Sequence, residues 1–254
     1  AARKVAALLA RYSLPPREYA EWRAEVGHVA GAPKVKVDEV RLSGFKVTNP
    51  EVMKTFITTK PGDTYDPAKA DADTTRLVAR RDFTSVNYQL TTEGKRNVLT
   101  YNATEKPWGP DYLLFDINLS TDFKGDTAFG LRMDYDKRWL NSLGGEWRTS
   151  VQLGRPNVFN TEFYQPLDLR QRFFVAPSLY ASQTLEYYYS GDTTIAQFDI
   201  RRYGVKLDGG VALGSWGEWR VGLQRGGVEA TTTVANPAVP EPNSTSVGAI
   251  TTRF

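Results

Sequence analysis

The chain has 254 residues, enough for one large domain or two ordinary ones, and it contains no cysteine, which excludes disulfides and thiolate metal sites. Its 32 basic and 29 acidic residues are intermixed, so no basic stripe indicates nucleic acid as a partner. With a mean hydropathy of −0.44 and no apolar run of about 18 residues, the sequence excludes a membrane-spanning helix but not membrane-spanning β-strands, which are only half apolar.

The first 34 residues have a helical pattern, and we predict a helical connector at 1–34. Apolar residues recur at helical spacing over residues 5–12, Pro15 and Pro16 interrupt the run, and a second short apolar face follows over residues 19–26. Two short amphipathic helices cannot bury such faces alone. The first apolar run is too short for a signal peptide. If the segments described below cross an outer membrane, the protein must be exported, and we then expect the chain to be part of a longer precursor.

Residues 35–106 have the pattern of a compact α+β unit with the order strand, helix, helix, strand, strand. Asn49-Pro50 and Asp66-Pro67 each place an N-cap residue before a proline at the first helical position, which predicts two helix starts. The second helix is expected to continue to Arg80. We expect the first helix to bury Val52, Met53, Phe56 and Ile57. Strands are predicted at residues 35–42, 83–90 and 98–102, with a turn at 92–95.

From residue 110 to residue 254, segments of about ten residues alternate apolar with polar side chains and are separated by turns rich in Gly, Asn and Asp. Side chains of a strand point to opposite faces in turn, so each segment has one apolar and one polar face. We count seven strand segments and the start of an eighth at Val247–Phe254. The longest are Leu113–Thr121, Thr127–Leu140, Glu146–Gly154, Arg172–Tyr189, Thr193–Gly214 and Gly217–Val234.

This alternation fits a soluble β-sandwich and a membrane-spanning barrel alike, but strand length and aromatic residues favour the barrel. Sandwich strands usually have about five or six residues, whereas strands that cross a membrane need about nine to eleven. Aromatic residues near segment ends are typical of the girdles at membrane interfaces. They include Trp139, Trp147, Phe159, Phe163, Tyr164, Tyr187, Tyr188, Tyr189, Trp216 and Trp219.

The α+β unit, with its phrases Val40–Phe45, Lys60–Asp66 and Leu77–Tyr88, resembles a POTRA domain, the polypeptide-transport-associated module that precedes Omp85-type outer-membrane barrels. One POTRA domain followed directly by barrel strands is similar to the C-terminal part of a patatin-like phospholipase of the type Vd autotransporter class. The stretches Leu9–Pro15 and Tyr19–Arg23 resemble the connector of such proteins. The family often has glycine before the Asp-Phe pair, where this chain has Arg81.

This resemblance implies an α+β POTRA domain at 35–106 followed by antiparallel transmembrane β-barrel strands at 110–254, about half of a 16-stranded Omp85-type barrel. It implies an outer-membrane translocator and anchor for a secreted patatin-like phospholipase, with the POTRA domain in the periplasm. The implied partners are outer-membrane lipid, the passenger of the same chain, the outer-membrane assembly machinery and a second copy. Two alternatives stay open: an Omp85-type transport or assembly component without an enzyme, and a soluble β-rich binding protein.

The chain lacks the catalytic phrases of a patatin-like lipase, which we expect upstream in the parent protein. Gly214-Ser215-Trp216-Gly217 has no glycine two residues before its serine, and it lies in a predicted hairpin turn, whereas a nucleophile elbow joins a strand to a helix. We expect a barrel truncated at Phe254. The alternative is a complete eight-stranded barrel that ends in this aromatic residue.

We predict no catalytic, cofactor-binding or metal-binding residue. His28, the only histidine, has no nucleophile phrase around it, and we assign it to the connector. Asp71 and Asp73 are expected on a solvated helix face. Alternation places the acidic and basic residues of the strands together on the polar face, as a hydrated channel wall rather than a metal site: Asp116, Asp134, Asp136, Arg132, Arg148, Lys206 and Arg220. The functional feature we predict is an exposed strand edge of the POTRA unit that accepts an extended passenger strand.

Overall fold

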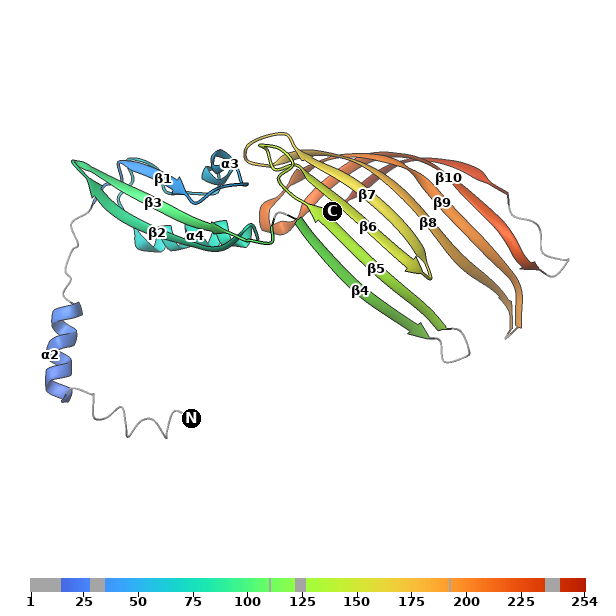
Figure 1. Ribbon diagram of the computed structural model, residues 1–254, viewed down its shortest axis with the longest axis horizontal. Coiled ribbons are helices and arrows are strands. Elements are labelled where there is room, and N and C mark those ends of the chain that lie inside the picture. Colours follow the sequence, from blue (N-terminus) through green and yellow to red (C-terminus); the bar gives the residue numbers. More distant parts are fainter. Residues whose placement is uncertain (1–14, 28–34, 110, 122–126, 192, 236–242) are drawn as a thin grey trace.

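The computed structural model describes residues 15–27, 35–109, 111–121, 127–191, 193–235 and 243–254. An α+β domain and a large curved sheet lie end to end, and the helix α2 (Pro16–Gly27) precedes them (Figure 1). The helical run predicted at 5–12 and His28 lie outside the described residues. Among the described helices, none is long and apolar enough to cross a membrane.

The α+β domain has the predicted order of elements, and its helices begin where the sequence places them. Asn49 and Asp66 are the N-caps, and each side chain accepts a hydrogen bond of 2.9 Å from the backbone N–H two residues later. The elements are β1 (Glu39–Ser43), α3 (Pro50–Lys54), α4 (Pro67–Ala79), β2 (Phe83–Glu93) and β3 (Arg96–Glu105). In the three-stranded sheet β3 is central, parallel to β1 and antiparallel to β2.

The core of this domain lies between the sheet and its helices. It contains Val37, Val52, Met53, Ile57, Leu77, Phe83, Val86, Leu99, Tyr101 and Ala103. Three of the four residues expected to be buried by the first helix are in this core, although α3 itself ends at Lys54. The strand predicted at 35–42 begins only at Glu39, because the backbone of Val37 pairs instead with Gly62 and Asp63 in the turn before α4.

The prediction for the acidic residues of α4 is right for Asp71 and wrong for Asp73. Asp71 is exposed, whereas the side chain of Asp73 is fully buried. Its carboxylate accepts hydrogen bonds from the backbone N–H groups of Thr58 and Thr59 at 2.8 and 3.1 Å, and from the hydroxyl of Tyr101 at 3.0 Å. Asp73 therefore holds the segment after α3 against the core.

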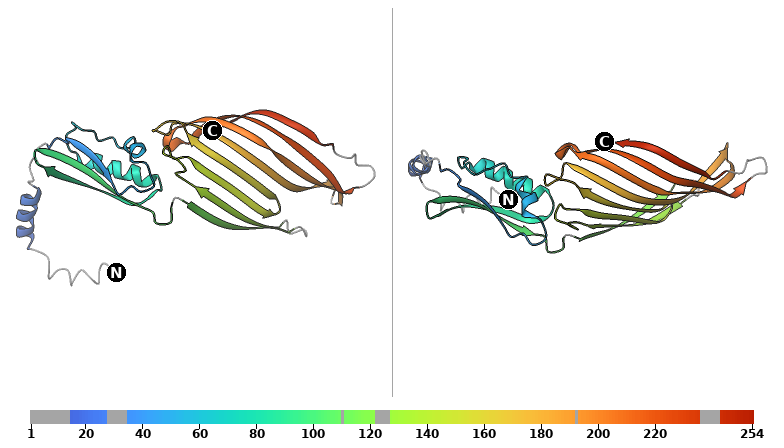
Figure 2. Two further views of the ribbon diagram at one scale, coloured as in Figure 1. Left: turned by 45° about the horizontal axis from the view of Figure 1, so that its top comes forward. Right: turned by 90° about the horizontal axis from the view of Figure 1, so that it is seen from above.

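The large sheet is an eight-stranded antiparallel meander in which each strand pairs with its sequence neighbours (Figure 2). The strands are β4 (Asp111–Thr121), β5 (Thr127–Lys137), β6 (Glu146–Gly154), β7 (Asn157–Pro166), β8 (Phe173–Ser190), β9 (Thr193–Ala212), β10 (Glu218–Ala235) and β11 (Thr245–Arg253). Within the described residues β4 and β11 each have one neighbour, so the sheet is open. The alternative of a closed eight-stranded barrel is thus not what these strands form.

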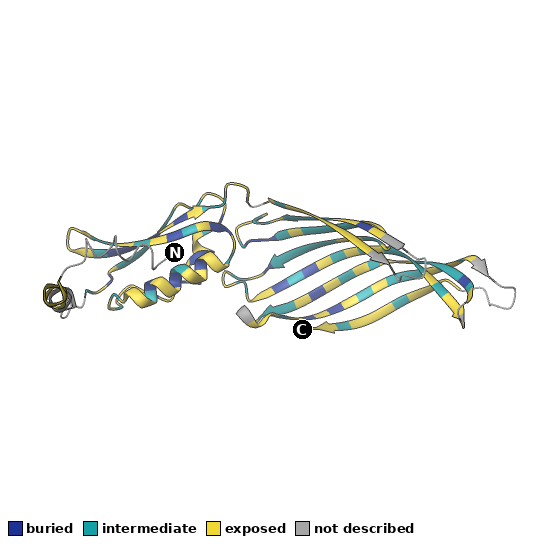
Figure 3. Cartoon of the chain, turned by 90° about the horizontal axis from the view of Figure 1, so that it is seen from below, coloured by how far each residue is buried: buried dark blue, intermediate teal, exposed yellow. Residues whose placement is uncertain are grey.

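Side chains of the large sheet divide between a convex outer face and a concave inner face. Curvature is evident from Arg220 on β10, which reaches Glu162 on β7, and from Gln224 on β10, which reaches Tyr180 on β8. Such contacts skip one or two intervening strands and are typical of a concave face. Exposed and more buried positions alternate along the strands (Figure 3).

The outer face carries large apolar side chains that remain exposed. Cross-strand register places Ile117 beside Leu131, and Leu131 beside Leu153, all on this face. The apolar band runs along β4 from Leu113 to Leu119, but along β10 from Trp219 to Leu223, nearer the α+β domain. A band that shifts along successive strands is expected where strands are tilted against a flat apolar layer.

Candidate functional site on the inner face of the sheet and at its junction with the α+β domain

The inner face carries an ionic network near the end of the sheet that adjoins the α+β domain. Glu162 on β7 accepts hydrogen bonds from Nη1 of Arg220 at 2.7 Å and from Nη1 of Arg148 on β6 at 3.3 Å. Arg148 also donates to Glu146 at 2.6 Å, and Arg220 to Glu218. Every partner sits on an inner-face position, so the network joins β6, β7 and β10 across the curve of the sheet.

Asp208 on β9 is the most buried acid of this network, with 1% of its side chain exposed. Arg253 on β11 donates to it at 2.6 Å, and Nζ of Lys206 lies 3.3 Å away. Gly222 on the neighbouring strand leaves room for this carboxylate, because a Cβ at that position would lie 1.9 Å from Oδ1 of Asp208. A substitution at this glycine would therefore displace the carboxylate.

Two aromatic rings lie beneath the arginines of this network. Tyr164 on β7 and Phe174 on β8 have ring centroids 4.5 Å apart. The guanidinium of Arg148 lies 4.6 Å from the centroid of Tyr164, and that of Arg220 lies 5.0 Å from the centroid of Phe174. Rings and carboxylates together fix both guanidinium groups, which gives the inner wall a rigid, charged patch.

The α+β domain is attached to the sheet through Asp82, whose side chain is only 4% exposed. It pairs with Nη1 of Arg138 at 2.8 Å and accepts a hydrogen bond from the indole N–H of Trp139 at 3.2 Å; both partners follow the end of β5. Burial raises the pKa of the Asp82 carboxyl, and Arg138 and Trp139 act against this shift. Trp139 has a positive φ of 57°, which ends β5 three residues before the predicted Leu140.

Further contacts join the same two parts of the molecule. Arg81 has a φ of 67°, in the left-handed region that favours glycine. Its carbonyl accepts a hydrogen bond of 3.1 Å from the Tyr112 hydroxyl at the start of β4. Arg80 donates to Gln171, and the Asn49 amide donates to the carbonyl of Ser142 at 2.7 Å. Contacts with the start of β4 and with two loops of the sheet, β5–β6 and β7–β8, hold the domain at its end.

A cavity of about 600 Å³, lined by charged and apolar side chains, lies between the α+β domain and the end of the sheet. Phe56 and Arg80 line it from the domain, and Glu146, Arg148 and Tyr164 line it from the inner face. The ionic network therefore borders this cavity through Glu146 and Arg148.

The strand edge predicted to accept a passenger strand exists in the α+β domain. β2 has 11 residues and, within the described part of the chain, only β3 as a neighbour. An extended chain could continue the sheet there by backbone hydrogen bonds. The pairing of a passenger strand with this edge stays a prediction.

The acidic residues of β4 and β5 that we considered as a metal site are placed on the inner face. Asp116 faces Arg132, and Arg132 is paired with Asp134 at 2.9 Å. The described residues contain no group of three or more His, Cys, Asp or Glu arranged to hold a metal ion. Gly214–Trp216 forms a short 3-10 turn between β9 and β10, the hairpin position predicted for it.

Sequence reasoning named Arg148, Lys206 and Arg220 as inner-face residues but missed the acids that hold them. One signal could have found Glu146, Asp208 and Glu218, since opposite charges recur two residues apart and therefore on one face of a strand. These pairs are Arg132 and Asp134, Glu146 and Arg148, Lys206 and Asp208, and Glu218 and Arg220. Glu162 carries no such signal, because the residues two positions away from it are Asn160 and Tyr164.

Comparison with known proteins places these features in context. Residues 35–106 match the POTRA family model, described as surface antigen variable number repeat. No curated protein matches the chain. Among solved structures it is similar to BamA from Haemophilus ducreyi lacking POTRA domains 1–3, with a TM-score of 0.63 and 10% identity over 86% of this chain.

Two further structures are similar at a TM-score of 0.50. These are CdiB from Acinetobacter baumannii, 10% identical over 85% of this chain, and CdiB from Escherichia coli, 12% identical over 86%. The chain spans 43% of the BamA structure and 41% of each CdiB structure. It therefore combines a POTRA domain with strands that have the fold of part of an Omp85-type barrel.

Proposed function

We propose that this chain is the POTRA-bearing and barrel-forming part of an Omp85-type protein transporter of the bacterial outer membrane. The observation that carries the proposal is the inverted sheet: large apolar side chains are exposed on its outer face, while the ionic network lies on its inner face. A water-soluble sheet would bury the apolar face. Here lipid covers the outer face and water fills the inside.

The position of the POTRA domain indicates how the sheet is oriented across the membrane. The domain is held at one end of the sheet by Asp82, Arg138 and Trp139, so that end faces the periplasm and the far loops face outside. A substrate polypeptide would pair with the β2 edge, pass the cavity between the domain and the sheet, and reach the charged inner wall. Outer-membrane lipid, the assembly machinery and a second copy of the chain are further partners in this proposal.

The test is the mobility of the full-length protein in a gel, after refolding in detergent, with and without boiling. A closed barrel resists unfolding by the gel detergent and migrates differently until it is boiled, so we expect a shift. A protein that shows no shift and stays monomeric in plain buffer would bury its apolar faces internally, which would refute the membrane proposal.

The narrower hypothesis, a translocator fused to a patatin-like phospholipase, rests on the sequence resemblance alone. It predicts a Gly-x-Ser-x-Gly phrase upstream of residue 1 in the full-length protein, between a strand and a helix. A full-length sequence without that phrase would leave a transporter that has no attached enzyme.

A further inference from the structure

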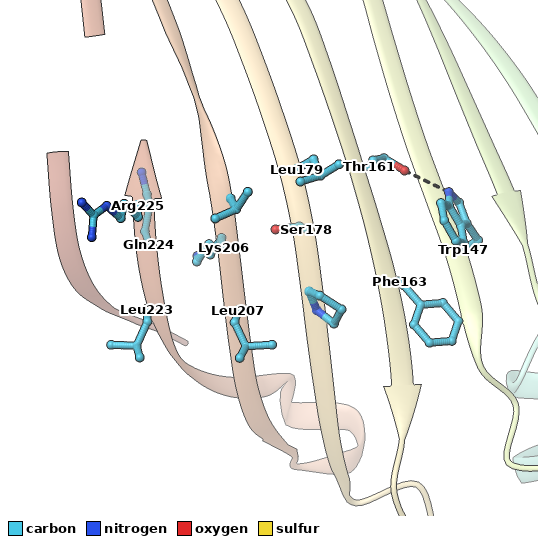
Figure 4. A pocket seen from close by; sticks show the side chains of 12 residues that line it. Trp147, Thr161, Phe163, Ser178, Leu179, Lys206, Leu207, Leu223, Gln224 and Arg225 are labelled. Carbon is cyan, nitrogen blue, oxygen red and sulfur yellow. Dashed lines mark hydrogen bonds between the residues drawn. The ribbon is translucent and has the colours of Figure 1, made fainter. Parts of the chain in front are cut away.

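An apolar groove of about 560 Å³ crosses β6 to β10 on the outer face of the sheet. Figure 4 shows its side chains in two rows, one ending at Leu223 and the other at Arg225. The apolar lining comes mainly from Trp147, Phe163, Pro177, Leu179, Leu207 and Leu223. At its opposite end the indole N–H of Trp147 donates to Thr161 at 2.9 Å, so this donor is satisfied within the sheet.

Arg225 is the cationic residue of this groove on the outer face. Register places it between Val205 on β9 and Gly248 on β11. Its side chain is exposed, and no residue in the described part of the chain forms an ion pair or hydrogen bond with it. An arginine beside an apolar membrane surface is stable where its long stem covers apolar atoms and its guanidinium reaches polar headgroups.

A second groove, of about 550 Å³, begins at the same arginine and continues toward the far end of the sheet. Ser244, Thr245 and Ser246 line it with hydroxyl groups. Beside Arg225 the surface is open, because a Cβ at Gly248 would meet nothing within 4 Å.

One carboxylate also lines this second groove. Glu229 lies four residues along β10 from Arg225, roughly 13 Å at the rise of a strand. It accepts a hydrogen bond of 2.9 Å from Tyr203, which fixes it away from the arginine. The groove therefore has its free cation at the apolar boundary and its anion farther out.

From these features we infer that the outer face carries a binding site for a phosphorylated, acylated glycolipid. Its acyl chains lie in the apolar groove, its phosphate pairs with Arg225, and its sugar contacts the hydroxyl-lined groove. Arginine and phosphate form strong charge-assisted hydrogen bonds. The inference rests on the proposed function, since only a membrane-inserted sheet presents this face to lipid.

The experiment is native mass spectrometry of the full-length protein in detergent, after it has passed the gel mobility test. Two probes are added separately: diphosphorylated lipid A and the same lipid without its phosphates. We expect the phosphorylated lipid to bind the wild type, and Arg225→Leu to weaken it about tenfold. Gly248→Phe should weaken it as well, because the new ring occupies the space beside Arg225.

The matched control is Arg202→Leu, which removes an arginine on the neighbouring strand but from the inner face. It should bind the phosphorylated lipid like the wild type. Equal binding by wild type and Arg225→Leu, or equal binding of both lipids, would refute the site while the mobility shift upholds the transporter. A wild type without a mobility shift would refute the proposed function and this inference with it.

Discussion

The α+β domain and the large sheet have the same alternation of apolar and polar residues, but the domain buries its apolar side chains and the sheet exposes them. In the domain, Leu99 and Tyr101 on β3 face a closed core and are fully buried. In the sheet, Phe115 and Ile117 occupy the same kind of alternate position and are more than half exposed. Periodicity therefore reports only that a strand has two faces, and the surrounding solvent decides which face is outside.

Buried carboxylates show the same contrast. Asp73 in the domain is held mostly by backbone N–H and hydroxyl groups, whereas Glu162 and Asp208 in the sheet are held by basic side chains from other strands. Local hydrogen bonds fix the short chain segment after α3. Long-range ion pairs hold the curvature of the sheet. Four substitutions can break or sharpen this comparison.

The largest effect is expected from Asp73→Ala. Burial acts to raise the pKa of this carboxyl, but hydrogen bonds from Thr58, Thr59 and Arg76 outweigh it and hold the pKa well below its usual range. Removal leaves several buried donors without an acceptor, so the α+β domain should lose about 3–5 kcal/mol of stability. Hydrogen exchange of the domain amides in the folded full-length protein measures this loss.

The pH dependence of that loss follows from the sign of the pKa shift. A carboxyl with a depressed folded pKa stabilises the fold above its unfolded pKa of about 3.9, and the contribution disappears as the pH falls through the folded value. The difference between wild type and Asp73→Ala should thus be constant near neutral pH and shrink below about pH 4. Asp71→Ala, the exposed control on α4, should change stability by no more than about 0.5 kcal/mol.

Next in size is Leu131→Arg on the outer face. Leu131 lies between Ile117 and Leu153, in the middle of the apolar stretch of β5. A charge there should reduce the stability of the lipid-inserted barrel by about 2–4 kcal/mol, whereas Arg132→Leu on the inner face should be milder. Urea titration of the refolded full-length protein compares the two. Equal losses would show that the faces are assigned wrongly.

Much of this fold is predictable because it depends on near neighbours in the chain. N-caps at Asn49 and Asp66 and the two faces of each strand are set within a few residues, and the sequence reveals them. The burial of Asp73 depends on Thr58, 15 residues away, and the pairing of Arg220 with Glu162 spans 58 residues. No local pattern encodes contacts that exist only once the sheet has curved.

An intermediate effect is expected from Glu162→Gln. The neutral amide keeps the shape but no longer balances Arg220 and Arg148, so barrel stability should fall by about 1–3 kcal/mol in the same urea titration. Glu186→Gln is the control, because Glu186 is exposed on β8 and has no partner among the described residues. A loss as large in the control would mean that net charge, not the network, is responsible.

The smallest effect is expected from Asp134→Asn, on the same inner face as Glu162. Its partner Arg132 is 49% exposed, so water screens the pair, and the loss should stay below about 1 kcal/mol. A double-mutant cycle with Arg132→Gln isolates the pair, and its coupling should weaken further with added salt. Coupling as strong as that of Arg220 with Glu162 would mean that the inner face is dry at β5. Weak coupling at β5 and strong coupling at β10 would instead show that water fills the inside of the wall except where the ionic network closes over the rings of Tyr164 and Phe174.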